Sequence, residues 1–322
     1  MSRLAALSAL FAFVASHASG DDKSVAQAMM HANEGDYELA FAVASPLADA
    51  GDDRAQHLVG FLNENGLGVP RDIATALMQY EKAALQGNAE AQFAIAILSL
   101  DGVYVKRDLK KAAGWLKLAA MRGHARAQAQ LGAMMMEGRG VEANASRAAS
   151  LFEGAAIAGD VIGQFNLGLA FSNGDGVQLN NGKAEYWLEK AAERGHVGAQ
   201  FNLALLYDAG RAGEDKKPKA ARWMRMAAQA ELPEAMTAMG LMVHRGADGA
   251  GFTAADWFEK AAKAGDPQGQ FLFAVALAEG DGRRKNRNLA RRWVKKALAD
   301  EALSPEARQS ALTLQKRLNA NG

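Results

Sequence analysis

A pattern that recurs every 36 residues constrains the fold of this chain more than any other feature. We number positions as offsets from the first residue of each repeat, which is offset 0. The sixth repeat is two residues shorter, so beyond its turn each residue number is two lower than the offset alone would give. The spacing between starts is 36 residues five times, then 34, then 36. Repetition at this length is typical of stacked two-helix units. The starts are Gly51, Gly87, Gly123, Gly159, Gly195, Glu231 and Gly265, with Glu301 at the next equivalent position.

Particular residue types return at fixed offsets. Offset 15 is glycine and offset 25 is alanine in all seven repeats, and offset 4 is always alanine or glycine. Offset 5 is glutamine in six of the seven, with Met236 as the exception. Small residues let helices approach closely, and we expect the tryptophans to fill the space between successive helix pairs. All five tryptophans share offset 28: Trp115, Trp187, Trp223, Trp257 and Trp293.

Each repeat predicts two helices joined by a short loop. The first helix ends at the glycine of offset 15, because glycine adopts the left-handed conformation without strain. In the shortened sixth repeat, Thr253 and Asp256 can form a capping box for the second helix. The triplet at 174–176, Gly-Asp-Gly, resembles a ligand loop but is predicted to be only the corner between two helices. Elsewhere the second helix begins after a short polar residue: Asp72, Asp108, Asn144, Asn180 or Asn286.

The expected fold is all-α, a right-handed α-solenoid of stacked helix pairs, because neither helix of a repeat can bury its apolar face alone. Residues 21–50 are expected to form an N-terminal capping helix pair. Residues 301–322 are expected to form a C-terminal capping helix and tail. The seven repeats are predicted at 51–86, 87–122, 123–158, 159–194, 195–230, 231–264 and 265–300.

The beginning of the chain has the composition of a secretory signal. Arg3 is basic, Leu4 to Ala15 form an apolar stretch of 12 residues, and small residues flank His17. This stretch is shorter than the ~20 residues that span a bilayer. We therefore expect a signal peptide at 1–18 and a periplasmic or secreted protein. The alternative is an N-terminal helix of the mature fold.

Composition limits the function classes. The 322 residues include 37 basic and 36 acidic side chains, so the net charge of +1 gives no case for a nucleic-acid partner. The chain has no cysteine, which excludes disulfides, thiolate metal sites and cysteine nucleophiles.

The motifs resemble those of SEL-one-like repeats, which are related to tetratricopeptide repeats but have a longer loop. The resemblance covers residues 51–300 and is clear in "GAQFNLALLYDAG" (198–210) followed by "AARWMRMAA" (220–228), although Ala212 stands where a second loop glycine is usual. It implies an adaptor that binds proteins or peptides on the concave surface formed by the first helices. Exported bacterial members of the family act as host-interaction factors, envelope scaffolds or periplasmic regulators. A cysteine-rich subgroup is credited with β-lactamase activity, but its cysteines are missing here.

No residue set predicts catalysis, a cofactor or a metal. The motifs H-E-x-x-H, G-x-x-x-x-G-K-[ST] and S-x-x-K are absent from the sequence. His124 and His196 lie two repeats apart at offset 1, where capping and packing are the expected roles. Met134 to Met136 are interpreted as core filling, with an adaptable contact surface as the alternative.

The partner-binding surface is predicted at three offsets of the first helix whose side chains vary between repeats. Side chains that vary while the packing positions stay the same are typical of a binding surface, and equally of any solvent-exposed surface. The candidates are Arg54, Glu90 and Arg126 at offset 3, Gln130, Asn166 and Asn202 at offset 7, and Asn65, Asp101 and Glu137 at offset 14.

The segment "RRKNRNLARRWVKK" (283–296) is basic and contains no acidic residue. One interpretation is a solvated helix face, and the other is a docking patch for anionic lipid, a cell-wall polymer or an acidic partner. The patch comprises Arg283, Arg284, Lys285, Arg287, Arg291, Arg292, Lys295 and Lys296.

Together these observations favour a monomeric, exported, non-enzymatic interaction scaffold that binds a protein or peptide segment and regulates an envelope sensor or enzyme. Two alternatives stay open. One is an envelope enzyme of the β-lactamase or penicillin-binding type. The other is a module that binds peptidoglycan or anionic lipid through 283–296.

Overall fold

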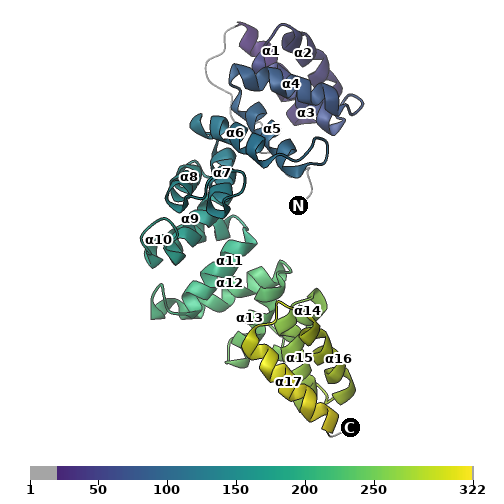
Figure 1. Cartoon of the computed structure of the whole chain (residues 1–322), viewed down its shortest axis with the longest axis vertical. Coiled ribbons are helices and arrows are strands. Elements are labelled where there is room, and N and C mark those ends of the chain that lie inside the picture. Colours follow the sequence, from purple (N-terminus) through teal and green to yellow (C-terminus); the bar gives the residue numbers. More distant parts are fainter. Residues whose placement is uncertain (1–19, 321–322) are drawn as a thin grey trace. The chain divides into compact units, whose positions relative to one another are not determined.

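A computed structural model of the chain describes residues 20–320, and within them every regular element is helical. Neighbouring helices in the chain pack against each other as antiparallel pairs (Figure 1). The helices are α1 (Gly20–Glu34), α2 (Tyr37–Asp49), α3 (Asp53–Asn65), α4 (Ile73–Gln86), α5 (Ala89–Asp101), α6 (Leu109–Met121), α7 (Ala125–Glu137), α8 (Ala145–Ile157), α9 (Val161–Asn173), α10 (Asn181–Glu193), α11 (Val197–Asp208), α12 (Lys217–Gln229), α13 (Pro233–His244), α14 (Ala254–Ala264), α15 (Pro267–Glu279), α16 (Arg287–Ala299) and α17 (Pro305–Ala320). A short 3₁₀ turn, Glu214–Lys216, precedes α12.

The chain divides within α9 into two compact units, one ending at Asn166 and the other beginning at Leu167. The N-terminal unit contains α1 to α8, and the C-terminal unit contains α10 to α17. In each unit a helix contacts both the helix before it and the helix after it, as expected for a stack of helix pairs. The fold class is therefore an α-solenoid, as predicted. At the C-terminal end, α17 packs on α15 and α16 through Ala311, Leu314 and Leu318.

The helix ends follow the predicted capping chemistry. Asn144 accepts a hydrogen bond from the backbone N–H of Arg147 at the start of α8, and Asp72, Asp108, Asn180 and Asn286 cap their helices in the same way. Thr253 and Asp256 form the predicted capping box. The glycine at offset 15 has a positive φ in all seven repeats, including φ +83° at Gly174. The triplet at 174–176 is thus a corner of the fold, as predicted.

The recurring glutamine at offset 5 joins each first helix to the second helix before it. Gln92 donates a hydrogen bond from Nε2 to the backbone oxygen of Ala84, over 3.0 Å, at the end of α4. The equivalent bonds of Gln56, Gln128, Gln164 and Gln200 reach the same carbonyl of the preceding helix. The same carbonyl also accepts from the backbone N–H of the glycine after the helix, as Ala84 does from Gly87, so the glutamine amide adds a second hydrogen bond that ties the next first helix to this turn.

Offset 29, directly after the tryptophan position, is a core position of the second helix that carries large side chains. Its side chains are at most 6% exposed, and they face offset 9 of the first helix in the same repeat. Offset 9 is glycine where offset 29 is Tyr80, Phe152, Leu188 or Phe258, and alanine where it is Leu116, Met224 or Val294. The rings of Tyr80, Phe152 and Phe258 therefore each face a glycine, which has no Cβ. The missing Cβ lets the ring lie flat on the backbone of the first helix.

The tryptophans of offset 28 lie at the edge of this core. Trp257 is 2% exposed and Trp223 is 9% exposed. Trp115, Trp187 and Trp293 are partly exposed. Trp115 packs against residues of both α4 and α5, so an indole does lie between successive helix pairs, as expected.

No helix within residues 20–320 is long and apolar enough to cross a membrane. The predicted signal peptide at 1–18 lies outside the described residues, and its export function stays a prediction.

Candidate functional site

Two of the three predicted offset-3 residues, Glu90 and Arg126, belong to a cluster at the start of the first helices. Glu90 of α5 lies with Oε2 3.1 Å from Nε2 of His124, the capping residue of α7. Nδ1 of His124 accepts a hydrogen bond from the backbone N–H of Ala127, so the proton on Nε2 faces Glu90. The guanidinium of Arg126 lies 4.7 Å from the ring centre of Phe93, which also stacks on His124.

The cluster contains a buried histidine that sequence reasoning missed. His57 of α3 is 7% exposed and packs on Tyr80. Burial lowers the pKa of His57, the charge of His124 lowers it further, and the charges of Glu90 and Asp53 act in the opposite direction. Offset 6, the position of His57, is phenylalanine in four other repeats. That aromatic preference was the available signal that this histidine is a core residue.

Glu90 is the acidic centre of the cluster. Burial alone would raise the pKa of Glu90, but the hydrogen bond from His124 and the positive charges of His124, His57 and Arg126 outweigh it, so the pKa lies below its ordinary value. Two of the predicted residues, Glu90 and Arg126, are thus brought together electrostatically. Arg54 is half-buried at the same offset of α3.

The predicted residues of offsets 7 and 14 are only partly available to a partner. Asn202 donates from Nδ2 to the backbone oxygen of Gly198 (2.8 Å), and Asn65 donates to that of Phe61 (2.9 Å). Each keeps its amide oxygen for another donor. Glu137 pairs with Arg139 over 2.9 Å in the following loop. Asp101 is exposed, and Gln130 and Asn166 are half-buried.

A row of apolar side chains at offset 10 of the first helices was missed by the sequence interpretation. This position is apolar in all seven repeats, yet it is buried in none of them. Leu205 is 41% exposed and Leu241 is 37% exposed. Phe61, Ile97 and Val275 pack partly against the core, whereas Leu205 and Leu241 are the most exposed members, and core packing leaves much of their surface uncovered. The row consists of Phe61, Ile97 and Ala133 in the N-terminal unit and Leu169, Leu205, Leu241 and Val275 in the C-terminal unit.

In the C-terminal unit this row borders a cavity of about 310 Å³ between α11 and α13. Leu205 and Leu241 form its apolar wall. Asp208 of α11 pairs with Arg245, which follows α13, over 2.8 Å, so an ion pair bridges the two first helices beside the leucines. His244 lines the same cavity and lies 3.8 Å from Asp281. Apolar anchors with charged neighbours suit recognition of a polypeptide segment.

The basic segment 283–296 is partly used by the fold itself. Arg283 binds Asp256 over 2.9 Å and also contacts Glu259, both on α14. Arg291 donates from Nε to the backbone oxygen of Leu318 in α17 over 3.2 Å. These two side chains hold α16 against its neighbours. Arg284, Lys285, Arg292, Lys295 and Lys296 are exposed, and docking through them stays a prediction.

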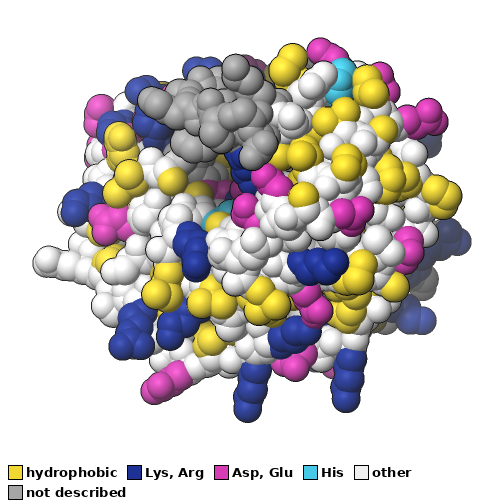
Figure 2. Space-filling view, turned by 90° about the horizontal axis from the view of Figure 1, so that it is seen from above, with side chains coloured by type: hydrophobic (Ala, Val, Ile, Leu, Met, Phe, Trp, Pro, Cys, Tyr) yellow, Lys and Arg dark blue, Asp and Glu magenta, His cyan; other side chains and the backbone are white. Residues whose placement is uncertain are grey.

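Charges of both signs are mixed with apolar side chains on the face seen in Figure 2. Residues 20–320 contain no group of three or more His, Asp or Glu side chains arranged to hold a metal ion.

Comparison with known proteins places these features in a family. A Sel1 repeat model matches residues 53–88, 89–124, 125–160, 161–196, 197–232, 233–266 and 267–300. A Sel1 repeat protein from Oxalobacter formigenes is 32% identical over 66% of this chain and 88% of its own, with a TM-score of 0.59. The antigen c5321 of uropathogenic Escherichia coli, which has an SLR fold, is 22% identical over 93% of this chain and 84% of its own, with a TM-score of 0.61. A search of the curated proteins finds no match.

Sel1 repeat proteins are in general scaffolds for protein–protein interaction, consistent with a protein partner. The seven matched repeats cover most of the sequence, and the chain belongs to the Sel1 repeat family.

Proposed function

We propose that this protein is a non-enzymatic scaffold that binds an extended or helical segment of a partner protein across the exposed faces of its first helices. The observation that carries the proposal is the offset-10 row, which is apolar in every repeat and buried in none. Leu205 and Leu241 leave about two-fifths of their surface exposed beside a cavity, and an exposed apolar surface with charged neighbours is typical of a binding groove.

The energetics suit additive binding. Fully burying a leucine side chain contributes about 1.5–3 kcal/mol, so covering the exposed two-fifths of Leu205 or Leu241 contributes about 0.6–1.2 kcal/mol each. The neighbouring polar side chains, such as Asn202 and the Asp208–Arg245 pair, then select among apolar segments through hydrogen bonds. Each such bond is worth about 1 kcal/mol.

The first test is affinity enrichment from envelope extracts, with the partner quantified by mass spectrometry. We expect the double variant Leu205→Gln, Leu241→Gln to lose the partner that the unmodified chain retains. Leu312→Gln is the matched control, because Leu312 is also a leucine, is 40% exposed and lies on α17, outside the seven repeats and outside the offset-10 row. Equal retention by all three proteins would rule out binding through this row.

We further propose that the protein is exported and acts in the periplasm, where it holds a membrane sensor or an envelope enzyme in one state. The support is the basic and apolar composition of residues 1–18. A fusion of residues 1–18 to alkaline phosphatase without its own leader tests export. Phosphatase activity in intact cells is expected, and its absence would refute export while leaving the scaffold proposal standing.

A further inference from the structure

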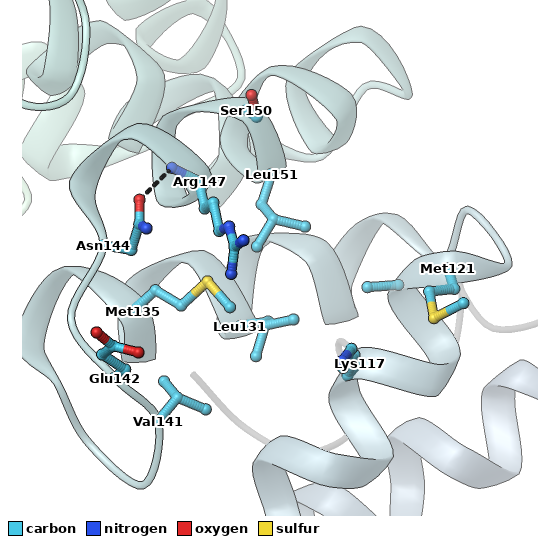
Figure 3. A pocket seen from close by; sticks show the side chains of 11 residues that line it. Lys117, Met121, Leu131, Met135, Val141, Glu142, Asn144, Arg147, Ser150 and Leu151 are labelled. Carbon is cyan, nitrogen blue, oxygen red and sulfur yellow. Dashed lines mark hydrogen bonds between the residues drawn. The ribbon is translucent and has the colours of Figure 1, made fainter.

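A second apolar cavity lies in the N-terminal unit, on the side of the second helices. It measures about 630 Å³ and is formed between α6 and α8, with α7 at its base. Leu131 and Met135 of α7 and Leu151 of α8 point into it, together with the side chain of Arg147 (Figure 3). Met121 and Lys117 line the side formed by α6.

The cavity has a specific origin in the repeat. Leu151 occupies offset 28, the position of tryptophan in five of the seven repeats. In the second repeat, Trp115 packs against a core cluster formed by α5 and the preceding second helix, α4. The equivalent space in the third repeat lies between α8 and α6, and the shorter Leu151 does not fill it. The smaller side chain at this position therefore accounts for part of the cavity.

The apolar surface continues beyond the cavity along the ends of the second helices. Offset 34 carries Leu85, Met121 and Ile157 in three successive repeats, and these side chains are 80%, 74% and 73% exposed. The same offset is Glu193, Gln229 and Lys263 in the next three repeats, so the packing of the helix pairs does not require an apolar residue at this position. The guanidinium of Arg122 lies against Gly87, which brings the ends of α4 and α6 together. A surface that spans several helix ends suits a macromolecule better than a small ligand.

The charges around the cavity indicate the sign of the charge on its partner. Lys117 and Arg147 line it from opposite sides, and neither forms an ion pair with any residue in 20–320. Glu142, in the loop before α8, is the single acidic residue of the lining. Two unpaired cations beside an apolar base favour a carboxylate-bearing partner.

We propose that this cavity receives an aromatic side chain of an acidic protein segment, whose carboxylates pair with Lys117 and Arg147 and whose apolar face covers Met121. The site goes beyond the proposed scaffold function, because it lies between second helices and shares no residue with the offset-10 row.

The test uses the full chain and a random-peptide phage library, with counter-selection on Leu151→Trp. This variant installs the residue that five other repeats have at offset 28 and places an indole ring in part of the cavity. We expect enriched peptides that contain an aromatic residue flanked by Asp or Glu. As synthetic fluorescein-labelled peptides, they should bind Leu151→Trp at least about tenfold more weakly in fluorescence anisotropy. Failure to enrich peptides, enrichment of basic ones, or equal binding to both proteins would overturn the proposal.

A second variant keeps the test independent of repacking. Lys117→Glu with Arg147→Glu leaves the apolar base intact and should lose the acidic peptides while gaining their lysine-substituted counterparts. Unchanged binding of the acidic peptides would overturn the charge assignment. Sedimentation equilibrium distinguishes a second copy of this chain as occupant. A dimer of the unmodified chain that becomes monomeric in Leu151→Trp would refute the acidic-segment proposal, and a monomer in both is expected.

Discussion

The pairing of offset 9 with offset 29 makes a sharp prediction for Gly132 and Phe152. Gly132 lies within α7, and a Cβ built on it would lie 2.6 Å from Cε1 and 2.8 Å from Cδ1 of Phe152. Contacts this short force the ring or the helix to move. Gly132→Ala should therefore destabilise the fold, although alanine is the better helix former.

Two opposing effects set the magnitude. Replacing a mid-helix glycine by alanine stabilises a helix by about 1 kcal/mol. Overpacking a core costs about 1–3 kcal/mol. Gly114 in α6 is the matched control, because a Cβ there meets no atom within 4 Å. The free energy of unfolding of Gly132→Ala should fall below that of Gly114→Ala by the overpacking cost, about 1–3 kcal/mol.

The chain itself suggests the compensating change. Ala96 faces Leu116 at the same two offsets of the second repeat. Phe152→Leu should therefore rescue Gly132→Ala, and the double-mutant cycle should show a favourable coupling of about 1–3 kcal/mol.

Urea unfolding followed by circular dichroism at 222 nm (the α-helix minimum) measures the four proteins of the cycle and the control Gly114→Ala, with an unchanged slope indicating the same exposed surface. A Gly132→Ala variant as stable as Gly114→Ala, or a cycle without coupling, would refute the packing argument.

Two further predictions concern the core. Because burial lowers the pKa of His57 below its ordinary value of 6.5, the unfolded chain binds more protons as the pH falls through 6.5, so the free energy of unfolding should decrease there. His57→Phe, which installs the residue of four other repeats, should remove this loss, and urea titrations at several pH values check it; an unchanged pH dependence would contradict the assignment. Trp257→Ala should lower the free energy of unfolding by about 3–5 kcal/mol, because Trp257 is 2% exposed. Trp187 is partly exposed, so Trp187→Ala should lower it by less. If urea unfolding showed that both variants lose the same free energy of unfolding, this expectation would be wrong.

Much of the fold could be predicted because the repeat samples each position seven times. Glycine at offset 15 and the caps Asp72 and Asn144 act through their own backbone neighbours, so the sequence reveals them directly. The fold class follows from the same local signals.

Relations between distant residues could not be predicted in the same way. The cluster of His57, Glu90 and His124 joins three repeats, and no single segment displays it. The tryptophans suggested offset 28 as a core position, but side chains are buried in all seven repeats one residue later, at offset 29, where the residue type varies with the glycine or alanine opposite.

The candidate surface was predicted in part. Glu90 and Arg126 do belong to one cluster, since their charges interact. The offset-10 row was visible in the sequence as an apolar position, but a leucine at a helix position is ordinarily read as core. Only its exposure, 41% at Leu205, separates it from the core.

The most direct test of the proposed binding face is site-specific photocrosslinking in living cells. Benzoylphenylalanine replaces Leu241 in one strain and Tyr186 in another, since Tyr186 is a similarly accessible residue, 53% exposed, on a second helix. Binding along the first helices predicts a crosslinked product of higher mass with Leu241 replaced and none with Tyr186 replaced. Equal crosslinking at both positions, or crosslinking at Tyr186 alone, would contradict it.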